Sequence, residues 1–91
     1  MKVKDDKKWY VYLLECSDKT YYCGITTDIT RRLNEHNKTK KSARYTRSRR
    51  PVSLVGYFEV DSRSAALKKE FSIKKMKKEE KMRMFSPENT Y

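Results

Sequence analysis

The chain has 91 residues and a formal net charge of +11, from 23 Lys and Arg residues against 12 Asp and Glu residues. This length suits a single domain, and a hydrophobic content of 36% allows only a small core, to which seven Tyr, three Phe and one Trp residues add large buried areas. No apolar run approaches the ~18–20 residues of a membrane-spanning helix, and no signal peptide opens the chain. We therefore expect an intracellular protein, cytoplasmic or nuclear, that is not secreted, does not enter a membrane and binds a polyanion such as nucleic acid.

Along the chain we expect a charged N-terminal lead over residues 1–8, one domain over residues 9–85 and a tail over residues 86–91. The domain begins with a predicted β-hairpin. Residues 9–15 (WYVYLLE) and 21–25 (YYCGI) are rich in aromatic and other β-favouring residues, and the segment between them is polar, as is typical of a turn.

Two features of this hairpin carry further expectations. Gly24 lies inside the second strand, which indicates a close approach by another backbone or a ligand, and its main role is expected to be steric. Cys16 and Cys23 are expected to lie across the hairpin as free thiols, because two cysteines are too few for a disulfide scaffold in a reducing compartment.

Helices are predicted on both sides of a third strand, residues 51–60 (PVSLVGYFEV). The first helix begins at Thr27 or Asp28 and the second at Ser62 or Ser64, since these side chains can cap a helix N-terminus. The second helix runs to about residue 78, and a short final helix follows to residue 85. The helical side chains expected to pack inward are Ile29, Leu33, Leu67, Phe71, Met82 and Phe85.

The predicted order is thus β-β-α-β-α(-α), an α+β fold with a small three-stranded antiparallel sheet flanked by helices. Across this order runs a set of polar residues that phosphodiester chemistry can use. Its members are Tyr10-Val11-Tyr12, Tyr22-Cys23-Gly24, Arg32, His36 and Glu70.

In identity and spacing, this set resembles the GIY-YIG nuclease superfamily over roughly residues 9–80. The likeness is greatest to its small stand-alone branch and to the related catalytic subunit of a flap endonuclease. Tyr10 stands where the family has glycine, and Cys23 where it has Ile or Val; the first change fits the fold if Tyr10 faces away from the cleft. The resemblance implies a metal-dependent endonuclease that acts on DNA.

Hydrolysis of a phosphodiester requires an activated water, charge stabilisation on the phosphoryl oxygens and help for the leaving oxygen. The resemblance implies that Glu70 holds one Mg²⁺ or Mn²⁺ ion. Arg32 would bind the non-bridging oxygens, which a guanidinium does better than an ammonium. Either Tyr12 or Tyr22 would serve as general base, and His36 would relay the proton or hold a tyrosine in place.

Residues 38–50 hold seven cationic residues and no acidic ones, next to Arg32 and His36 in sequence. We expect this basic segment to contact a nucleic-acid backbone, with DNA as the substrate, in branched, flapped or single-stranded form, and RNA as an open alternative. A small domain reads little sequence, so a partner protein is an expected source of further specificity. The predicted binding residues are Lys40, Lys41, Arg44, Arg47, Arg49 and Arg50.

Two other functional classes fit the same sequence. The first is a non-catalytic basic module that binds nucleic acid on the same fold, and the second is a protein–protein adaptor. Under either alternative, Glu70 is only an ion-pair partner of Lys69 or Lys74 on its helix, and the tyrosines are ordinary packing residues of a hairpin.

Overall fold

The computed structural model describes residues 8–85. All but Lys8 of the expected lead over residues 1–8, and the whole expected tail over residues 86–91, lie outside these described residues. The elements follow the order β-β-α-α-β-α-α, which confirms the predicted α+β class and adds one short helix. They are β1 (Trp9–Glu15), β2 (Tyr21–Thr26), α1 (Ile29–Lys38), α2 (Arg44–Arg47), β3 (Ser53–Val60), α3 (Arg63–Lys74) and α4 (Lys78–Phe85).

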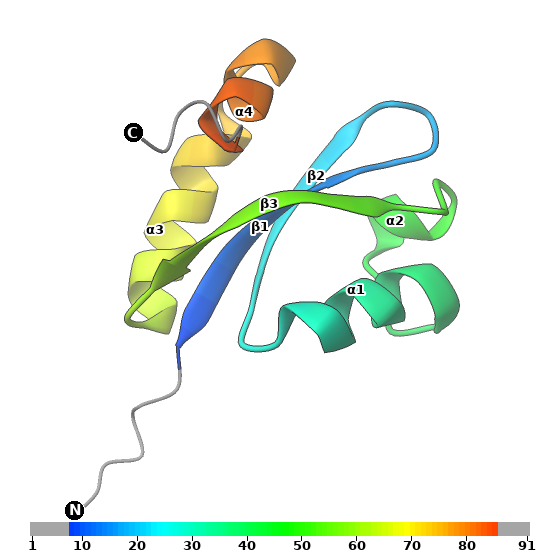
Figure 1. Ribbon diagram of the computed structural model, residues 1–91, viewed down its shortest axis with the longest axis horizontal. Coiled ribbons are helices and arrows are strands. Elements are labelled where there is room, and N and C mark those ends of the chain that lie inside the picture. The colour runs from blue at the N-terminus through cyan, green and yellow to red at the C-terminus, as the bar shows by residue number, and fades with distance from the viewer. Residues whose placement is uncertain (1–7, 86–91) are drawn as a thin grey trace, which may run out of the picture.

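The three strands form one antiparallel sheet in the order β2-β1-β3 (Figure 1). β1 is central, so that Tyr12 pairs with Gly24 of β2 and with Tyr57 of β3. β3 begins two residues later than predicted. Proline has no N–H to give to a ladder, and Val52 exchanges two hydrogen bonds with the side-chain amide of Asn37 on α1 instead of pairing with β1.

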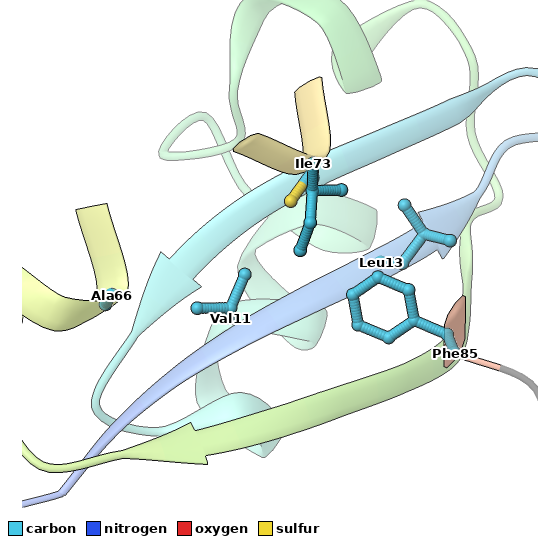
Figure 2. Packing of buried hydrophobic residues seen from close by; sticks show 6 residues of the cluster. Val11, Leu13, Ala66, Ile73 and Phe85 are labelled. Atoms are coloured by element: carbon cyan, nitrogen blue, oxygen red, sulfur yellow. The ribbon is translucent and has the colours of Figure 1, made fainter. Parts of the chain in front are cut away.

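The sheet separates two groups of helices, with α3 and α4 on one face and α1 and α2 on the other (Figure 1). Successive residues of β1 point to opposite faces. Val11 and Leu13 meet Ile73 of α3 and Phe85 of α4 in a fully apolar cluster (Figure 2), whereas Tyr12 and its neighbours Leu14 and Cys16 face α1.

Side-chain caps fix where the two longer helices begin. Asp28 accepts a hydrogen bond from the backbone N–H of Arg31 at 3.0 Å, and Ser62 accepts one from the N–H of Ala65 at 3.1 Å. Of the alternatives left open by the sequence, Asp28 and Ser62 are therefore the caps, since each oxygen satisfies a donor that the helix leaves free.

The predicted inward face of α3 is wrong. Ala66 and Ile73 are completely buried, whereas 38% of Leu67 and 64% of Phe71 are exposed. Each residue of a helix is rotated by about 100° from the one before, so a face centred on Ala66 and Ile73 carries Leu67 and Phe71 out of the core. The small side chain at Ala66 lets the helix approach the sheet closely.

Other expectations for the core are mixed. Ile29 and Leu33 of α1 pack against the buried cluster of their face, and Phe85 of α4 is buried, as predicted. Met82 is 47% exposed, so its predicted inward packing is wrong. Its sulfur instead accepts a hydrogen bond from the Tyr21 hydroxyl at 3.1 Å near the surface.

Both cysteines are free, as predicted, and both are buried. Burial raises the pKa of the Cys23 thiol to about 12, so it is not a nucleophile at neutral pH. Within residues 8–85, no helix is long and apolar enough to cross a membrane.

Candidate active site

The candidate site lies along β2, at the edge of the sheet. Tyr12 and Gly24 are direct partners in the ladder, and Tyr22 is two residues before Gly24, so all three point to the face covered by α1. Tyr10 shares this face, but its ring packs against Tyr57 of β3 at a centroid distance of 5.6 Å.

Gly24 is required by the position of the Tyr12 side chain. A Cβ atom at residue 24 would lie 2.5 Å from the Tyr12 hydroxyl and 2.7 Å from its ring carbon Cζ. The close approach predicted at this glycine is made by the Tyr12 side chain and not by another backbone. The steric role is confirmed.

His36 connects the tyrosines to α2. It is completely buried, although the sequence placed it at the border of the apolar face of α1. Its Nε2 atom lies 2.8 Å from the Tyr12 hydroxyl and its Nδ1 atom 2.8 Å from Oγ1 of Thr46. Burial, helped by the nearby cations Arg32 and Arg50, lowers the pKa of His36 to about 4, so the ring is neutral at neutral pH.

Arg32 is held in place by two oxygen atoms. Its Nη1 donates to Oε1 of Glu35 at 2.8 Å and to the backbone carbonyl of Lys41 at 2.8 Å. The same guanidinium acts to lower the pKa of both Tyr12 and Tyr22. Glu35 was not predicted from the sequence, although its spacing three and four residues after two arginines is the ordinary signal of an ion pair on a helix.

The two tyrosine hydroxyls differ in their surroundings. Burial raises the pKa of both, and more so for Tyr12, which is only 3% exposed. Tyr22 is half-buried and has two cations, Lys74 and Arg32, that favour its anion. Its ring lies 5.4 Å from the His36 ring and 6.0 Å from the ring of Tyr45.

Glu70 belongs to α3, which packs on the face of the sheet opposite to α1. Its carboxylate disfavours the anions of Tyr22 and Cys23, which places it within electrostatic range of β2. The side chain is 18% exposed and pairs with Lys74 at 3.4 Å, as the ion-pair alternative predicts. Tyr22 is thus the residue that is influenced both by Arg32 and by Glu70.

Glu70 is the one acidic side chain of α3, and so the one carboxylate of this helix that could bind a metal. No group of three or more His, Cys, Asp or Glu side chains suited to a metal occurs among residues 8–85. Mg²⁺ is nevertheless commonly held through one or two carboxylates, with waters and substrate phosphate oxygens as its other ligands. Glu70 therefore fits a metal of this kind, with Lys74 as its competitor for the carboxylate.

The basic segment divides into two layers. The guanidinium groups of Arg47, Arg49 and Arg50 bond within the protein: Arg47 to the carbonyl of Lys40, Arg49 to Asp18, and Arg50 to the carbonyls of His36 and Thr39. The predicted binding residues Lys40, Lys41 and Arg44 are exposed.

Tyr45 is a site residue that the sequence analysis did not select. Its ring stacks on Tyr22 at an angle of 21° and carries the guanidinium of Arg49 at 3.9 Å from its centroid. Tyr45 and Arg49 also line a cavity of about 610 Å³, together with Arg44, Arg47 and Ser48. The sequence signal that could have identified Tyr45 is its position as the single aromatic residue of a basic segment, where an aromatic ring can stack on a base.

The family model of the GIY-YIG catalytic domain matches residues 8–83, and the chain belongs to this family. It is 57% identical over 77 residues to a UPF0213 protein of Syntrophus aciditrophicus, covering 85% of this chain and 88% of that protein. A UPF0213 protein of Haloquadratum walsbyi is 49% identical over 75 residues, covering 82% and 83% of the two chains.

Solved structures agree with this assignment. The solution NMR structure of protein EF2693 from E. faecalis has a TM-score of 0.60 at 38% identity and covers 89% of this chain and 85% of its own. The UPF0213 protein BH0048 from Bacillus halodurans has a TM-score of 0.53 at 38% identity, with coverages of 85% and 81%. The resemblance noted from the sequence is therefore confirmed.

Proposed function

We propose that the protein is a metal-dependent endonuclease that hydrolyses phosphodiester bonds in DNA. Membership of the GIY-YIG catalytic family supports this class of reaction. The observation that carries the proposal is the electrostatic environment of Tyr22, whose anion is favoured by the Arg32 guanidinium of α1 and disfavoured by the Glu70 carboxylate of α3. A phenol, a cation and a carboxylate that would bind a metal thus act on one another electrostatically, which supports a shared site.

Glu70 is the residue that would hold one Mg²⁺ or Mn²⁺ ion. When bound, such an ion polarises the phosphate and stabilises the charge on the leaving oxygen. The protein itself supplies the partly buried position of Glu70 on α3 and the neighbouring ammonium group of Lys74.

Arg32 would bind the non-bridging oxygens of the scissile phosphate. Its fixation by Glu35 and by the Lys41 carbonyl means that little side-chain freedom is lost when a phosphate binds. Charge-assisted bonds from a positioned guanidinium also strengthen as charge develops on the phosphoryl oxygens in the transition state.

Tyr22 is the better candidate for the general base. It is more exposed than Tyr12 and lies near two cations, Arg32 and Lys74, that favour its anion. Tyr12 and His36 are buried and hydrogen-bonded to each other, which suits a supporting role in which they order the hydroxyl groups beside the substrate.

The basic segment would bind the DNA backbone with its exposed layer. Lys40, Lys41 and Arg44 are free to meet phosphates. The guanidinium of Arg50 instead bonds to the His36 carbonyl of α1, and that of Arg47 bonds to the Lys40 carbonyl within the segment. A binding surface this small is more suited to recognising branched or single-stranded DNA than to reading a long base sequence. RNA is the alternative polymer, and a partner protein would be a source of further specificity.

The decisive experiment is a cleavage assay with Mg²⁺ or Mn²⁺ on single-stranded, duplex, flap, fork, four-way-junction and RNA substrates. The wild type is compared with Glu70→Gln, which keeps the shape of the side chain but removes its charge. Glu79→Gln, an exposed change on α4, is the matched control. We expect cleavage by the wild type and the control and none by Glu70→Gln; equal cleavage by all three would disprove the metal-binding role.

A second candidate function is a non-catalytic module that binds nucleic acid. The observation in its favour is the Glu70–Lys74 ion pair at 3.4 Å, which gives the carboxylate a structural role. This alternative predicts salt-sensitive binding without cleavage under any divalent ion. Binding would then be lost on neutralising Lys40, Lys41 and Arg44 and would be unaffected by Glu70→Gln.

A further inference from the structure

His36 is surrounded by three hydrogen-bonding groups whose directions can be compared. Nε2 faces the Tyr12 hydroxyl at 2.8 Å, while Nδ1 faces Oγ1 of Thr46 at 2.8 Å and the backbone N–H of Ala43 at 3.4 Å. His36 and Thr46 are completely buried and Tyr12 is 3% exposed, so bulk water does not compete for these bonds.

A neutral imidazole carries one hydrogen, and the hydrogen bond at one nitrogen decides which nitrogen keeps it. The backbone N–H of Ala43 cannot rotate, and it is directed at Nδ1. A hydrogen on Nδ1 would point at the hydrogen of this N–H, and the two would repel each other. The fixed donor therefore requires a lone pair at Nδ1.

The hydroxyl group of Thr46 can rotate, and two acceptors are within its reach. It lies 2.8 Å from Nδ1 of His36 and 3.0 Å from the carbonyl of Ala43. That carbonyl already accepts the backbone N–H groups of Thr46 and Arg47, each at 3.1 Å. The carbonyl therefore has two donors without the Thr46 hydroxyl hydrogen, which is available for Nδ1.

We propose that Thr46, together with the Ala43 N–H, fixes His36 in the tautomer with its hydrogen on Nε2, so that His36 donates to Tyr12. The hydroxyl hydrogen of Tyr12 is then free to point at a bound phosphodiester. Thr46 is a positioning residue in this scheme, since it acts on Tyr12 only through His36.

The choice of tautomer matters because the substrate is an anion. With the hydrogen on Nε2, Tyr12 accepts from His36 and offers its own hydrogen to a phosphate oxygen. With the hydrogen on Nδ1, Tyr12 would donate to His36 and turn only its lone pairs to the phosphate, which repels them. This catalytic consequence rests on the proposed function, whereas the tautomer itself does not.

The tautomer can be measured directly because His36 is the only histidine of the chain. In an ¹⁵N spectrum at neutral pH, the nitrogen that carries the hydrogen and the one that does not have widely separated shifts, and their couplings to the ring hydrogens identify each. We expect the hydrogen on Nε2 in the wild type. A hydrogen on Nδ1 would overturn the proposal.

Two variants separate the hydroxyl from the shape of the side chain. Thr46→Val keeps the volume and removes the donor, whereas Thr46→Ser keeps the donor. We expect Thr46→Ser to give the wild-type pattern and Thr46→Val to shift Nδ1 and show a fraction of the other tautomer. Identical spectra for Thr46→Val and the wild type would contradict a positioning role, and the wild-type spectrum remains decisive if Thr46→Val fails to fold.

Kinetics on the best DNA substrate of the cleavage panel, with Mg²⁺, supply the second test. Loss of a partner that orients a metal-ligating histidine typically costs about 10–100-fold. By analogy we expect kcat to fall by about that factor in Thr46→Val, while KM is little changed and Thr46→Ser is active. An unchanged kcat in Thr46→Val would refute the link to Tyr12. If the wild type cuts no substrate, the proposed function fails, and the tautomer measurement still judges the positioning by Thr46.

Discussion

The two faces of the sheet differ in what their buried side chains do. Towards α3 and α4, Val11 and Leu13 enter a cluster in which every buried member is apolar. Towards α1 and α2, the next residue along the same strand, Tyr12, enters a chain of hydrogen bonds through His36 to Thr46. One strand therefore contributes to stability on one face and to the candidate chemistry on the other.

This difference has an energetic reason. Apolar contacts stabilise in proportion to the area removed from water, whereas a buried polar group is tolerated only if it is hydrogen-bonded. Among residues 8–85, no buried side-chain nitrogen or oxygen lacks a hydrogen-bond partner. The polar groups on the face towards α1 are thus completely paired, beside the hydrophobic cluster of Leu14, Cys16 and Val52 on that same face.

Breaking the apolar face should give the largest loss of stability. Ile73 is completely buried, so Ile73→Ala is expected to lower the free energy of unfolding by about 2–5 kcal/mol, through lost burial and a cavity. Phe71→Ala, on the exposed side of the same helix, should change it by less than about 0.5 kcal/mol. Urea unfolding measures both, and similar losses would contradict the assignment of the faces.

Breaking the polar face should affect activity instead. Arg32→Lys keeps the charge but loses the forked geometry held by Glu35, and we expect cleavage to fall by about 10²–10³-fold with little change in stability. Arg31→Lys is the control, because Arg31 contacts the same carboxylate at 3.4 Å but is largely exposed. Equal rates for the two variants would argue against a role for Arg32 in catalysis.

The dependence of stability on pH should sharpen the comparison. The pKa of His36 falls from 6.5 to about 4 on folding, because burial disfavours the charged ring. Between pH 6.5 and pH 4, His36 binds a proton in the unfolded chain but not in the folded protein. The free energy of unfolding is therefore full at pH 7 and falls progressively towards pH 4, by up to about 3 kcal/mol.

Chemical unfolding across this range tests the prediction, with His36→Gln as the comparison. The stability of the variant should decline less steeply between pH 6.5 and pH 5, whatever its absolute value. Curves that run parallel to those of the wild type would show that another group is responsible.

The smallest predicted effect concerns the exposed layer of the basic segment. Arg44→Gln should weaken DNA binding and reduce the slope of log K against log salt by about one unit, if Arg44 neutralises one phosphate. Lys68→Gln, an exposed change on α3, should leave the slope nearly unchanged. A salt titration by fluorescence anisotropy distinguishes the two, and equal slopes would mean that the segment acts only through bulk charge.

Features encoded within a few residues were predictable from the sequence. The hairpin followed from β-favouring residues around a polar turn, and the start of α1 from a capping side chain, Asp28. Tyr12, Tyr22, Arg32 and His36 were found together because the order and spacing of a known family were present.

The errors and omissions depend on tertiary contacts. Leu67 and Phe71 are more hydrophobic than Ala66, so periodicity alone selected the wrong face of α3; the helix turns its small residue to the sheet to approach it closely. Thr46 carries no sequence signal, since its hydroxyl matters only when α2 is folded back over His36.

Gly24 has a consequence for how the hairpin pairs. Because the Tyr12 side chain lies across residue 24, the ladder can close only where a residue without a side chain stands opposite Tyr12. A slip by two residues would place Tyr22 or Thr26 there, and a slip by one would turn every side chain to the wrong face. Gly24 weakens the strand locally, but it fixes the register of β2 on β1. The same residue therefore specifies both the pairing of the hairpin and the placement of Tyr12 and Tyr22.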